Sequence, residues 1–450
     1  MLKKISGSVI LLAAMLLPGA KSFAQSGEYV SYTPYSIFGI GNLEQQGSPY
    51  NIGMGGVGIA SRNNRYLNLR NPAAITARDT LSVMMDFSVK NNNTIFSQNS
   101  ATGRVNSANN STNIGSMAFA FPIWRSLTSA VGITPYSSGG YSYRTKETDP
   151  EIIGRIGNIS YYDYGQGSFY KLFAAVAGNP VKNLAIGAEG GFIFGNYDKY
   201  FTQVFTKTGV NSAQDSYKLH LNSWTAKFGA QYERPVGKKT KLGIGVTYAL
   251  GTRLNGTMIY THQSAGSAET VDITPADTTF LGSLSASKSV RLGSELGLGI
   301  SLNRDEKLRL ELDCLLSDWR GTRIDKTPGF AISDSDNSFT AGLCGSLRAG
   351  VEYTPDRYSI RSRIKRASYR VGTYYNNEYY KVAGNEINSF GITFGTTIPV
   401  YVKGLMNGVT IGADLGQRGS LSGGLVRERY FRLSVGVNLH DVWFIKPRYE

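Results

Sequence analysis

Apolar and polar side chains alternate with a period of two residues along most of the sequence. The alternating segments run for about 9–16 residues each, which is the pattern of β-strands with two unlike faces. In one clear segment, the apolar face carries Leu242, Ile244, Val246, Tyr248 and Leu250. No comparable run has the period of about 3.6 residues that marks an amphipathic helix. We therefore expect few and short helices.

The alternation predicts about 14 strands, whose ends are defined to within about 2–4 residues. They are expected near residues 81–90, 112–122, 127–136, 167–178, 183–194, 220–234, 239–252, 286–302, 306–316, 338–353, 368–376, 387–398, 407–416 and 429–440. The chain is therefore predicted to be an all-β protein.

The connections between these strands differ in length in a regular way. Short links at 123–126, 179–182, 235–238 and 303–305 alternate with long polar stretches at 91–111, 137–166, 195–219, 253–285 and 317–337. Outer-membrane barrels have an even number of strands, short periplasmic turns and long extracellular loops, whereas the strands of soluble proteins average about 5–6 residues. The sequence predicts a transmembrane antiparallel β-barrel (81–450) with both ends of the strand array on the periplasmic side.

The first 24 residues have the pattern of a secretory signal peptide. Lys3 and Lys4 precede the apolar run 9–17, and residues 22–24 offer a cleavage site before Gln25. The apolar run is shorter than the roughly 20 residues that a membrane-spanning helix needs, and no Cys follows the cleavage site for a lipid anchor. We expect an exported protein in the outer membrane of a Gram-negative envelope.

Composition agrees with a barrel and limits the kinds of partner. Mean hydropathy is −0.20 although the chain has 53 Gly and 28 Tyr, as expected where lipid-facing and lumen-facing residues alternate. The four tryptophans, Trp124, Trp224, Trp319 and Trp443, are expected near the membrane interfaces. The net charge of +15 suits lipid headgroups, lipopolysaccharide phosphates or an acidic ligand, or a solvated surface without a partner. Export argues against nucleic acid.

Residues 25–80 carry a different pattern, with eight glycines and little apolar periodicity. Irregular backbone at membrane depth is tolerated only inside protein or a wet cavity. We expect this segment to form a plug, or hatch, in the lumen. The alternative is a disordered periplasmic tail.

Residues 53–79 read GMGGVGIASRNNRYLNLRNPAAITARD, with Asn71, Pro72 and Ala73 just before the first strand. This segment resembles the N-terminal hatch of the FadL/TodX family of long-chain fatty-acid and hydrophobic-compound transporters. The stretches 131–143, 308–319 and 347–361 are similar to later parts of that family. The YTPYSIFGIGNL opening and the WFIKPRY end resemble a Bacteroidota-like branch.

The resemblance implies roles for particular residues. Asn71, Pro72 and Ala73 would set the geometry of the hatch, because Pro fixes φ and Asn caps turns. The glycines expected to form the hatch turn are Gly53, Gly55, Gly56 and Gly58. Basic residues receive ligand headgroups in the family, so Arg309 or Arg348 could do so here. The alternative is that both pair with lumen carboxylates.

Catalytic chemistry has little support in the sequence. The three histidines lack metal-ligand spacing, and neither a nucleophile elbow nor a P-loop is present. Gly53, Gly55 and Gly58 satisfy G-x-G-x-x-G but have no strand–turn–helix around them. Cys314 and Cys344 fall on opposite strand faces, so both are expected to be free, packed thiols. We expect no enzyme, no cofactor and no metal.

One basic run stands apart in the predicted periplasmic turns. It consists of Arg357, Arg361, Arg363, Lys365, Arg366 and Arg370. Such a run is usually a solvated face, but it could also dock an acidic partner protein or phosphates.

Two functions remain open. The first is porin-like passive transport, the uptake of hydrophobic small molecules such as long-chain fatty acids, driven by transfer between apolar environments. The second is a FadL-like accessory subunit of a larger outer-membrane complex, for barrel assembly or secretion, that does not itself transport. The polar character of 137–166 and 195–219 differs from the apolar capture loops of the family. An apolar lumen path would favour transport, whereas a blocked lumen would favour a subunit.

Overall fold

In the computed structural model, the described residues are 32–79, 81–100, 103–124, 126–207, 209–265, 278–283, 290–330, 339–359, 361–402 and 405–442. The predicted signal peptide, its cleavage site and Trp443 lie outside these residues. Within the described ranges, no helix has the length and apolar character needed to cross a membrane.

Fourteen strands of the described chain close into an antiparallel barrel, as the alternation predicted. In order around the wall they are β2 (Ser82–Ser100), β3 (Gly103–Trp124), β4 (Leu127–Lys146), β5 (Ile159–Val181), β6 (Leu184–Phe205), β7 (Ser212–Pro235), β8 (Thr240–Ala249), β11 (Ser294–Arg304), β12 (Leu308–Asp318), β14 (Leu343–Tyr353), β15 (Ser368–Val382), β16 (Asn385–Val402), β17 (Leu405–Arg418) and β18 (Arg427–Val442). β18 pairs with β2 from Arg427↔Ser97 to Val442↔Ser82 and closes the ring.

The alternation sorts side chains between lipid and lumen. On β12, Leu310, Leu312 and Leu316 point outward and are 39–47% exposed, whereas Arg309 and Asp313 point inward and are buried. A closed ring pairs the backbone groups that would otherwise lie in lipid without partners. The sequence pattern therefore defines both the barrel and its inner face.

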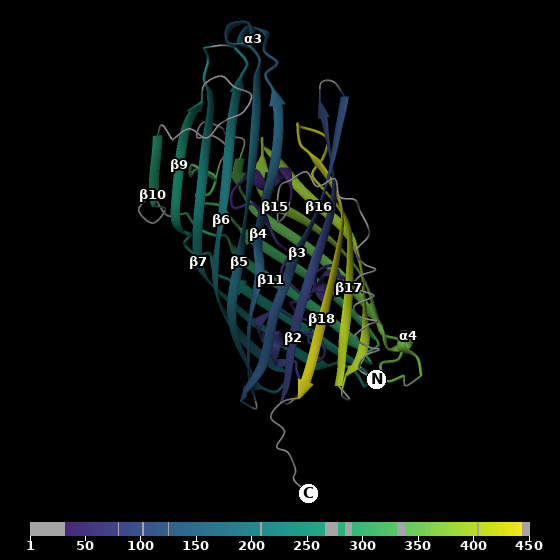
Figure 1. The fold of residues 1–450 in the computed structure, drawn as a ribbon. Helices are drawn as coiled ribbons and strands as arrows, with labels where there is room; N and C mark the ends of the chain where they lie inside the picture. Colours follow the sequence, from purple (N-terminus) through teal and green to yellow (C-terminus); the bar gives the residue numbers. More distant parts are fainter. Residues whose placement is uncertain are drawn as a thin grey trace.

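Several stretches predicted as loops are strands that continue beyond the apolar belt. β2 and β3 cover most of 91–111, β4 and β5 extend into 137–166, and β6 and β7 fill most of 195–219. In Figure 1, β4–β7 rise above the rest of the wall and carry α3 (Pro150–Ile156) at their top. An antiparallel sheet can face water, so polar alternation there still supports strands.

Four further strands attach to the same sheet. β9 (Asn255–Ala265) pairs with the upper half of β7 and with β10 (Thr278–Ser283), β13 (Phe339–Ala341) pairs with β15, and β1 (Asn42–Leu43) pairs with β4. The predicted strand 338–353 is therefore two strands, β13 and β14.

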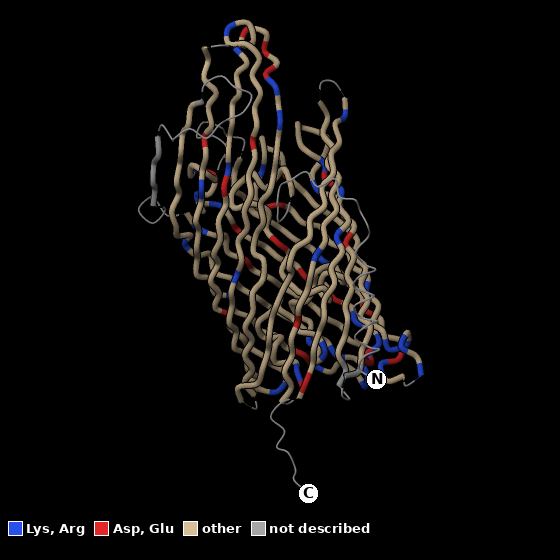
Figure 2. Tube along the Cα trace, viewed as in Figure 1, with Lys and Arg blue, Asp and Glu red and all other residues tan. Residues whose placement is uncertain are grey.

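The two ends of the barrel differ. At the turn end, β5 and β6 are joined by Lys182–Asn183, and β7 and β8 by residues 236–239. One connection there is long, the basic loop 354–367 with α4 (Arg363–Arg366), which projects sideways at the lower right of Figure 1. Lys and Arg gather in this region in Figure 2. At the opposite, loop end, β15 and β16 are joined by only two residues, Ala383 and Gly384.

Two local predictions were wrong. The strand predicted at 286–302 does not include Val290 and Leu292, which are buried inside the barrel. The strand begins only at Ser294, so the alternation does not continue through Gly293. Trp319 was expected at a membrane interface but is 2% exposed inside the loop end, while Trp124 and Trp224 are outward.

Cys314 and Cys344 are free and on opposite faces, as predicted. In the register, Cys314 faces Leu347 and Cys344 faces Ser317. Cys344 points inward, where its sulfur lies 2.7 Å from the carbonyl oxygen of Asn377, whereas Cys314 is exposed on the outer face rather than packed.

We expect the purified protein to contain two reduced thiols. Alkylation in denaturant without reductant should add two labels, detected by intact mass, and prior reduction should add no more. A chain that takes up label only after reduction would contradict this arrangement, because opposite faces cannot be bridged without backbone distortion.

Candidate functional site

Residues 32–79, here named the inner segment, lie inside the barrel. The segment contains η1 (Pro34–Ile37), β1, α2 (Pro49–Ile52) and η2 (Pro72–Thr76), and most of its side chains are buried. It begins near the loop end and runs down to the turn end, where β2 starts (Figure 1).

The strands of the wall carry glycine at many positions where the inner segment packs against them. At eight wall glycines, an added Cβ would meet backbone atoms of the inner segment: Gly187, Gly243, Gly245, Gly299, Gly350, Gly372, Gly395 and Gly412. A Cβ on Gly395 would lie 2.8 Å from the Cα of Gly53, and one on Gly187 would lie 2.6 Å from the carbonyl carbon of Pro72. The two parts therefore pack backbone against backbone over much of the circumference.

The predicted hatch glycines lie in this contact. Gly53 touches β16, and Gly55 donates its N–H to Thr393 Oγ1 at 2.7 Å. Gly55 and Gly56 have φ of +74° and +79°, in the left-handed region where a side chain is strained. Gly58 donates to Asp313. The structure thus brings all four glycines to one turn against the wall.

Asn71, Pro72 and Ala73 begin η2. Asn71 Oδ1 accepts the N–H of Ala73 at 3.0 Å, which is the N-cap arrangement, and Pro72 occupies the first helical position. Asn71 Nδ2 donates to Ile59 O at 2.8 Å and to Ala230 O of β7 at 3.2 Å. Asn71 therefore caps the start of η2 and also joins the inner segment to the wall.

Two side chains of the wall, Asp313 and Gln231, hold the same turn. Asp313 Oδ2 accepts the N–H groups of Gly58 at 2.7 Å and Ile59 at 3.0 Å. Gln231 Nε2 donates to the carbonyl oxygens of Ile59 at 2.8 Å and Ser61 at 3.2 Å. A wall carboxylate and a wall amide thus bind donors and acceptors of one short stretch.

The loop end of the lumen is filled by an apolar cluster, here named the loop-end cluster. Its aromatic members are Tyr35, Phe38, Tyr141, Phe169, Tyr197, Trp319, Phe330, Phe339, Tyr379 and Tyr380. Tyr380 donates to Tyr35 O at 3.1 Å, and Tyr379 donates to Gly41 O at 3.0 Å. The inner segment supplies the centre of the cluster, so this end of the lumen is packed rather than open.

Lys199 is a buried cation within this end of the barrel. It is 1% exposed and donates to Ile37 O at 2.7 Å, with Gly39 O and Phe330 O each at 3.4 Å. The sequence placed it in a solvated loop, because polar residues surround it there. The only signal in the sequence is that Lys199 falls on an inward-facing position if the alternation of β6 is continued to it.

The wall has a seam between β3 and β4. These strands pair only between Met117–Trp124 and Leu127–Ile133, so the upper part of β4 lacks β3 as a partner. The inner segment takes the open edge: β1 pairs with Ser137 and Ser138, and Thr33 donates its N–H to Gly140 O at 2.8 Å. The seam is thus covered from inside.

The two predicted headgroup residues have different environments. Arg309 is buried, donates to Tyr50 Oη at 3.3 Å and Ser61 Oγ at 3.0 Å, and lies 3.9 Å from Glu311. Arg348 donates to Ser346 Oγ at 2.8 Å and to Asn376 Oδ1 at 3.3 Å. Arg309 therefore takes part in holding the inner segment, whereas Arg348 faces a cavity.

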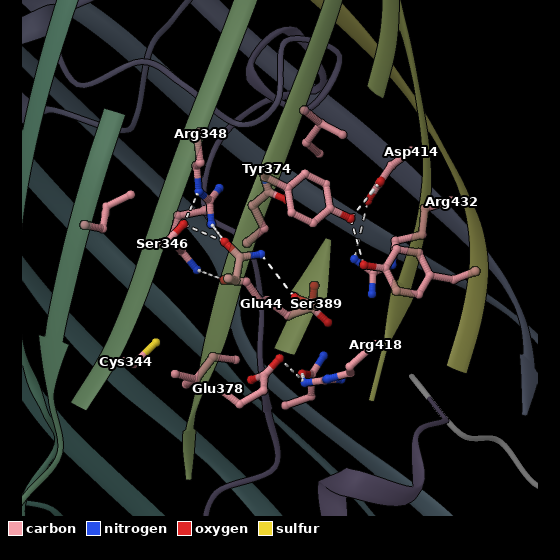
Figure 3. A pocket seen from close by; sticks show the side chains of 18 of the residues that line it. Glu44, Cys344, Ser346, Arg348, Tyr374, Glu378, Ser389, Asp414, Arg418 and Arg432 are labelled. Carbon is pink, nitrogen blue, oxygen red and sulfur yellow. Dashed lines mark hydrogen bonds and ion pairs between the residues drawn. The ribbon is translucent and has the colours of Figure 1, made fainter. Parts of the chain in front are cut away.

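That cavity, of about 220 Å³, lies between the inner segment and the wall near β14–β18 (Figure 3). Its charged lining comprises Glu44, Arg70, Lys90, Glu295, Arg348, Glu378, Asp414, Arg418 and Arg432. A chamber ringed by both signs of charge is unsuited to an acyl chain. Among the described residues, no group of His, Cys, Asp and Glu could hold a metal ion.

Known proteins resemble this chain in fold. A family model described as BamG matches residues 1–450. The Pseudomonas putida toluene transporter TodX is 14% identical with a TM-score of 0.60 and covers 90% of this chain and 100% of its own. A Pseudomonas aeruginosa FadL homologue is 12% identical with a TM-score of 0.57 and the same coverage.

The CymD monoaromatic hydrocarbon channel is 13% identical with a TM-score of 0.57, covering 87% of this chain and 97% of its own. No curated protein sequence matches. At these identities the structures show a shared fold, which confirms the predicted FadL-type barrel. The Bacteroidota-like branch stays a prediction.

Replacement of Asp313 tests the attachment of the inner segment. Asp313→Asn removes a charge-assisted acceptor of two buried N–H groups, each bond being worth about 1.5–3 kcal/mol. We expect a lower guanidinium midpoint and faster limited proteolysis within residues 32–79.

Asp318→Asn is the matched control on the same strand, because its ion pair with Arg320 is exposed and screened by solvent. Equal midpoints and equal proteolysis in wild type and Asp313→Asn would show that the contact does not hold the segment.

Proposed function

The chain belongs to the BamG family, and we propose on this basis that it is a non-transporting subunit of an outer-membrane complex for β-barrel assembly. The observation that carries the proposal is a lumen filled by the inner segment.

Both routes that a hydrophobic molecule could take are occupied. The axial route meets the loop-end cluster and then the glycine contacts between inner segment and wall. The lateral route at the β3–β4 seam is covered by β1 and the residues around it. Passive transport needs an apolar path, and the cavity beside the inner segment is lined by charge instead.

The basic loop 354–367 offers a surface for a partner on the turn side. Tyr358 and Ile364 are 75% and 73% exposed, next to the exposed cations Arg361, Arg363 and Lys365. Hydrogen bonds from Asp356 N–H to Lys365 O and from Tyr369 Oη to Ile364 O hold the loop in one shape. Exposed apolar groups among cations suit an acidic periplasmic partner protein.

Co-purification tests this function. Tagged protein extracted in mild detergent from its own membranes should elute with stoichiometric outer-membrane assembly proteins, identified by mass spectrometry. Tyr358→Ser/Ile364→Ser should lower their recovery, whereas Val236→Ser, 66% exposed in another turn, should not. A barrel that elutes alone, carrying bound hydrophobic molecules, would exclude the subunit role.

A second function, passive uptake of hydrophobic compounds such as long-chain fatty acids, is favoured by the seam. Some proteins with this fold are named as toluene transporters, and an incompletely paired wall could open sideways if the inner segment moved. The inner segment would then be a movable hatch, with Asn71, Pro72 and Ala73 setting its geometry.

A disulfide across the seam separates the two functions. Leu43 and Ser137 are paired residues of β1 and β4, so Leu43→Cys/Ser137→Cys should cross-link in a chain whose own cysteines are replaced by Ala. For a transporter, oxidation should abolish uptake of labelled fatty acid and reduction should restore it.

For a subunit, the oxidised protein should support assembly as well as wild type, and a deletion strain should take up fatty acid normally. Leu43→Cys alone is the control. Reversible loss of uptake in the oxidised double variant would reject the non-transporting role.

A further inference from the structure

Two arginines face the lumen cavity from its two sides. Arg70 belongs to the inner segment just before Asn71, and Arg348 belongs to β14 of the wall. Both side chains line the same chamber. The pair therefore joins, across one small chamber, the two parts of the molecule that any movement of the inner segment would separate.

The carboxylates that line the cavity have other partners. Glu378 lies 2.7 Å from Arg418, Asp414 3.5 Å from Arg432, Glu44 3.8 Å from Lys90, and Glu295 3.9 Å from Lys227. Within the described residues, neither Arg70 nor Arg348 has a carboxylate within 4.0 Å. The lining thus leaves these two cations without a paired counter-charge.

Several N–H groups of the two guanidinium groups also lack a hydrogen-bond acceptor. Arg70 is 4% exposed, its Nε and Nη2 have no hydrogen-bond partner among the described residues, and its Nη1 reaches only Gln46 O at 3.5 Å. Arg348 Nη1 likewise has none. A buried charged donor without a partner is costly, so an unpaired guanidinium pair beside a cavity indicates a ligand that completes it.

Asp313 is a further carboxylate of the lumen wall. Its Oδ2 accepts the N–H groups of Gly58 and Ile59, and within the described residues it forms no ion pair with either arginine. The free N–H donors of Arg70 and Arg348 are therefore left for a ligand with acceptor oxygens. An oxyanion supplies such oxygens together with a charge opposite to that of the guanidinium groups.

We propose that this cavity binds a small oxyanion of the phosphate type, which bridges Arg70 of the inner segment and Arg348 of the wall. Planar guanidinium groups bind such oxygens through paired N–H donors. Neighbouring hydroxyls of Ser346 and Ser389 line the same chamber and add polar contacts (Figure 3).

The bound anion would act as a latch. One of its ligands is fixed to the wall and the other to the inner segment, so it stabilises the docked state over any displaced one. A ligand that binds only one state increases the stability of that state, and the increase grows with the logarithm of the ratio of ligand concentration to Kd. This property belongs to the isolated chain and does not depend on whether the protein has partners.

Equilibrium dialysis of the purified full chain in detergent against radiolabelled inorganic phosphate tests the site. We expect saturable binding near one phosphate per chain in wild type, with affinity at least tenfold weaker in Arg70→Gln and in Arg348→Gln. The control Arg320→Gln removes the same charge from an exposed pair with Asp318 and should bind like wild type.

Thermal unfolding at constant ionic strength provides the second readout. Phosphate should raise the unfolding temperature of wild type and Arg320→Gln but not of either cavity variant. Without phosphate, both cavity variants should still unfold in one cooperative transition, which would establish that they fold.

Displacement of the label by glycerol 3-phosphate would identify a lipid headgroup as the source of the anion, and its failure would identify a free anion. Equal binding in all four proteins would show an adventitious ion only. Absence of saturable binding in wild type would show that water fills the cavity. Either result overturns the proposal.

Discussion

The rest of this structure depends on one constraint. The backbone of the inner segment must lie in close contact with a wall that carries glycine at the contact positions. A ring of fourteen strands encloses more space than short inward side chains fill. The chain fills that space with its own N-terminal backbone, and glycine removes the side chains that would hold it away. Irregular backbone at membrane depth must find hydrogen-bond partners within protein. Asp313 and Gln231 supply these partners from the wall.

Different forces hold the inner segment at different heights. At the loop end it is stabilised by apolar burial, since Tyr35 and Phe38 pack among aromatic residues of the wall. At mid-depth, where glycine leaves little apolar area to bury, hydrogen bonds and charge dominate. Nearer the turn end, Arg370 forms an ion pair with Glu352 at 3.1 Å, and its guanidinium group lies over the ring of Tyr50. The aromatic cluster at the loop end excludes water, whereas the stability of the polar contacts at mid-depth depends on the ions bound beside them.

The sequence predicted the barrel because alternation is a local property that each strand records independently. It did not predict strand length above the membrane, because polar residues such as those of 195–205 alternate without the apolar signal used to find strands. It also treated Gly243 and Gly245 as ordinary inward positions, although these positions receive the inner segment. Asp313 and Lys199 depend on contacts between residues more than 150 apart, which no local pattern contains.

The seam shows how a barrel with the fold of a transporter can have both its axial and its lateral route closed. Loss of pairing between β3 and β4 leaves a strand edge, and an unpaired edge must be covered or it recruits another chain. Here the covering strand is β1, which comes from the segment that also blocks the axial route. One element therefore closes both exits. Opening either exit requires this segment to move away from the wall, and its apolar, backbone and hydrogen-bond contacts with the wall favour a closed scaffold over a channel.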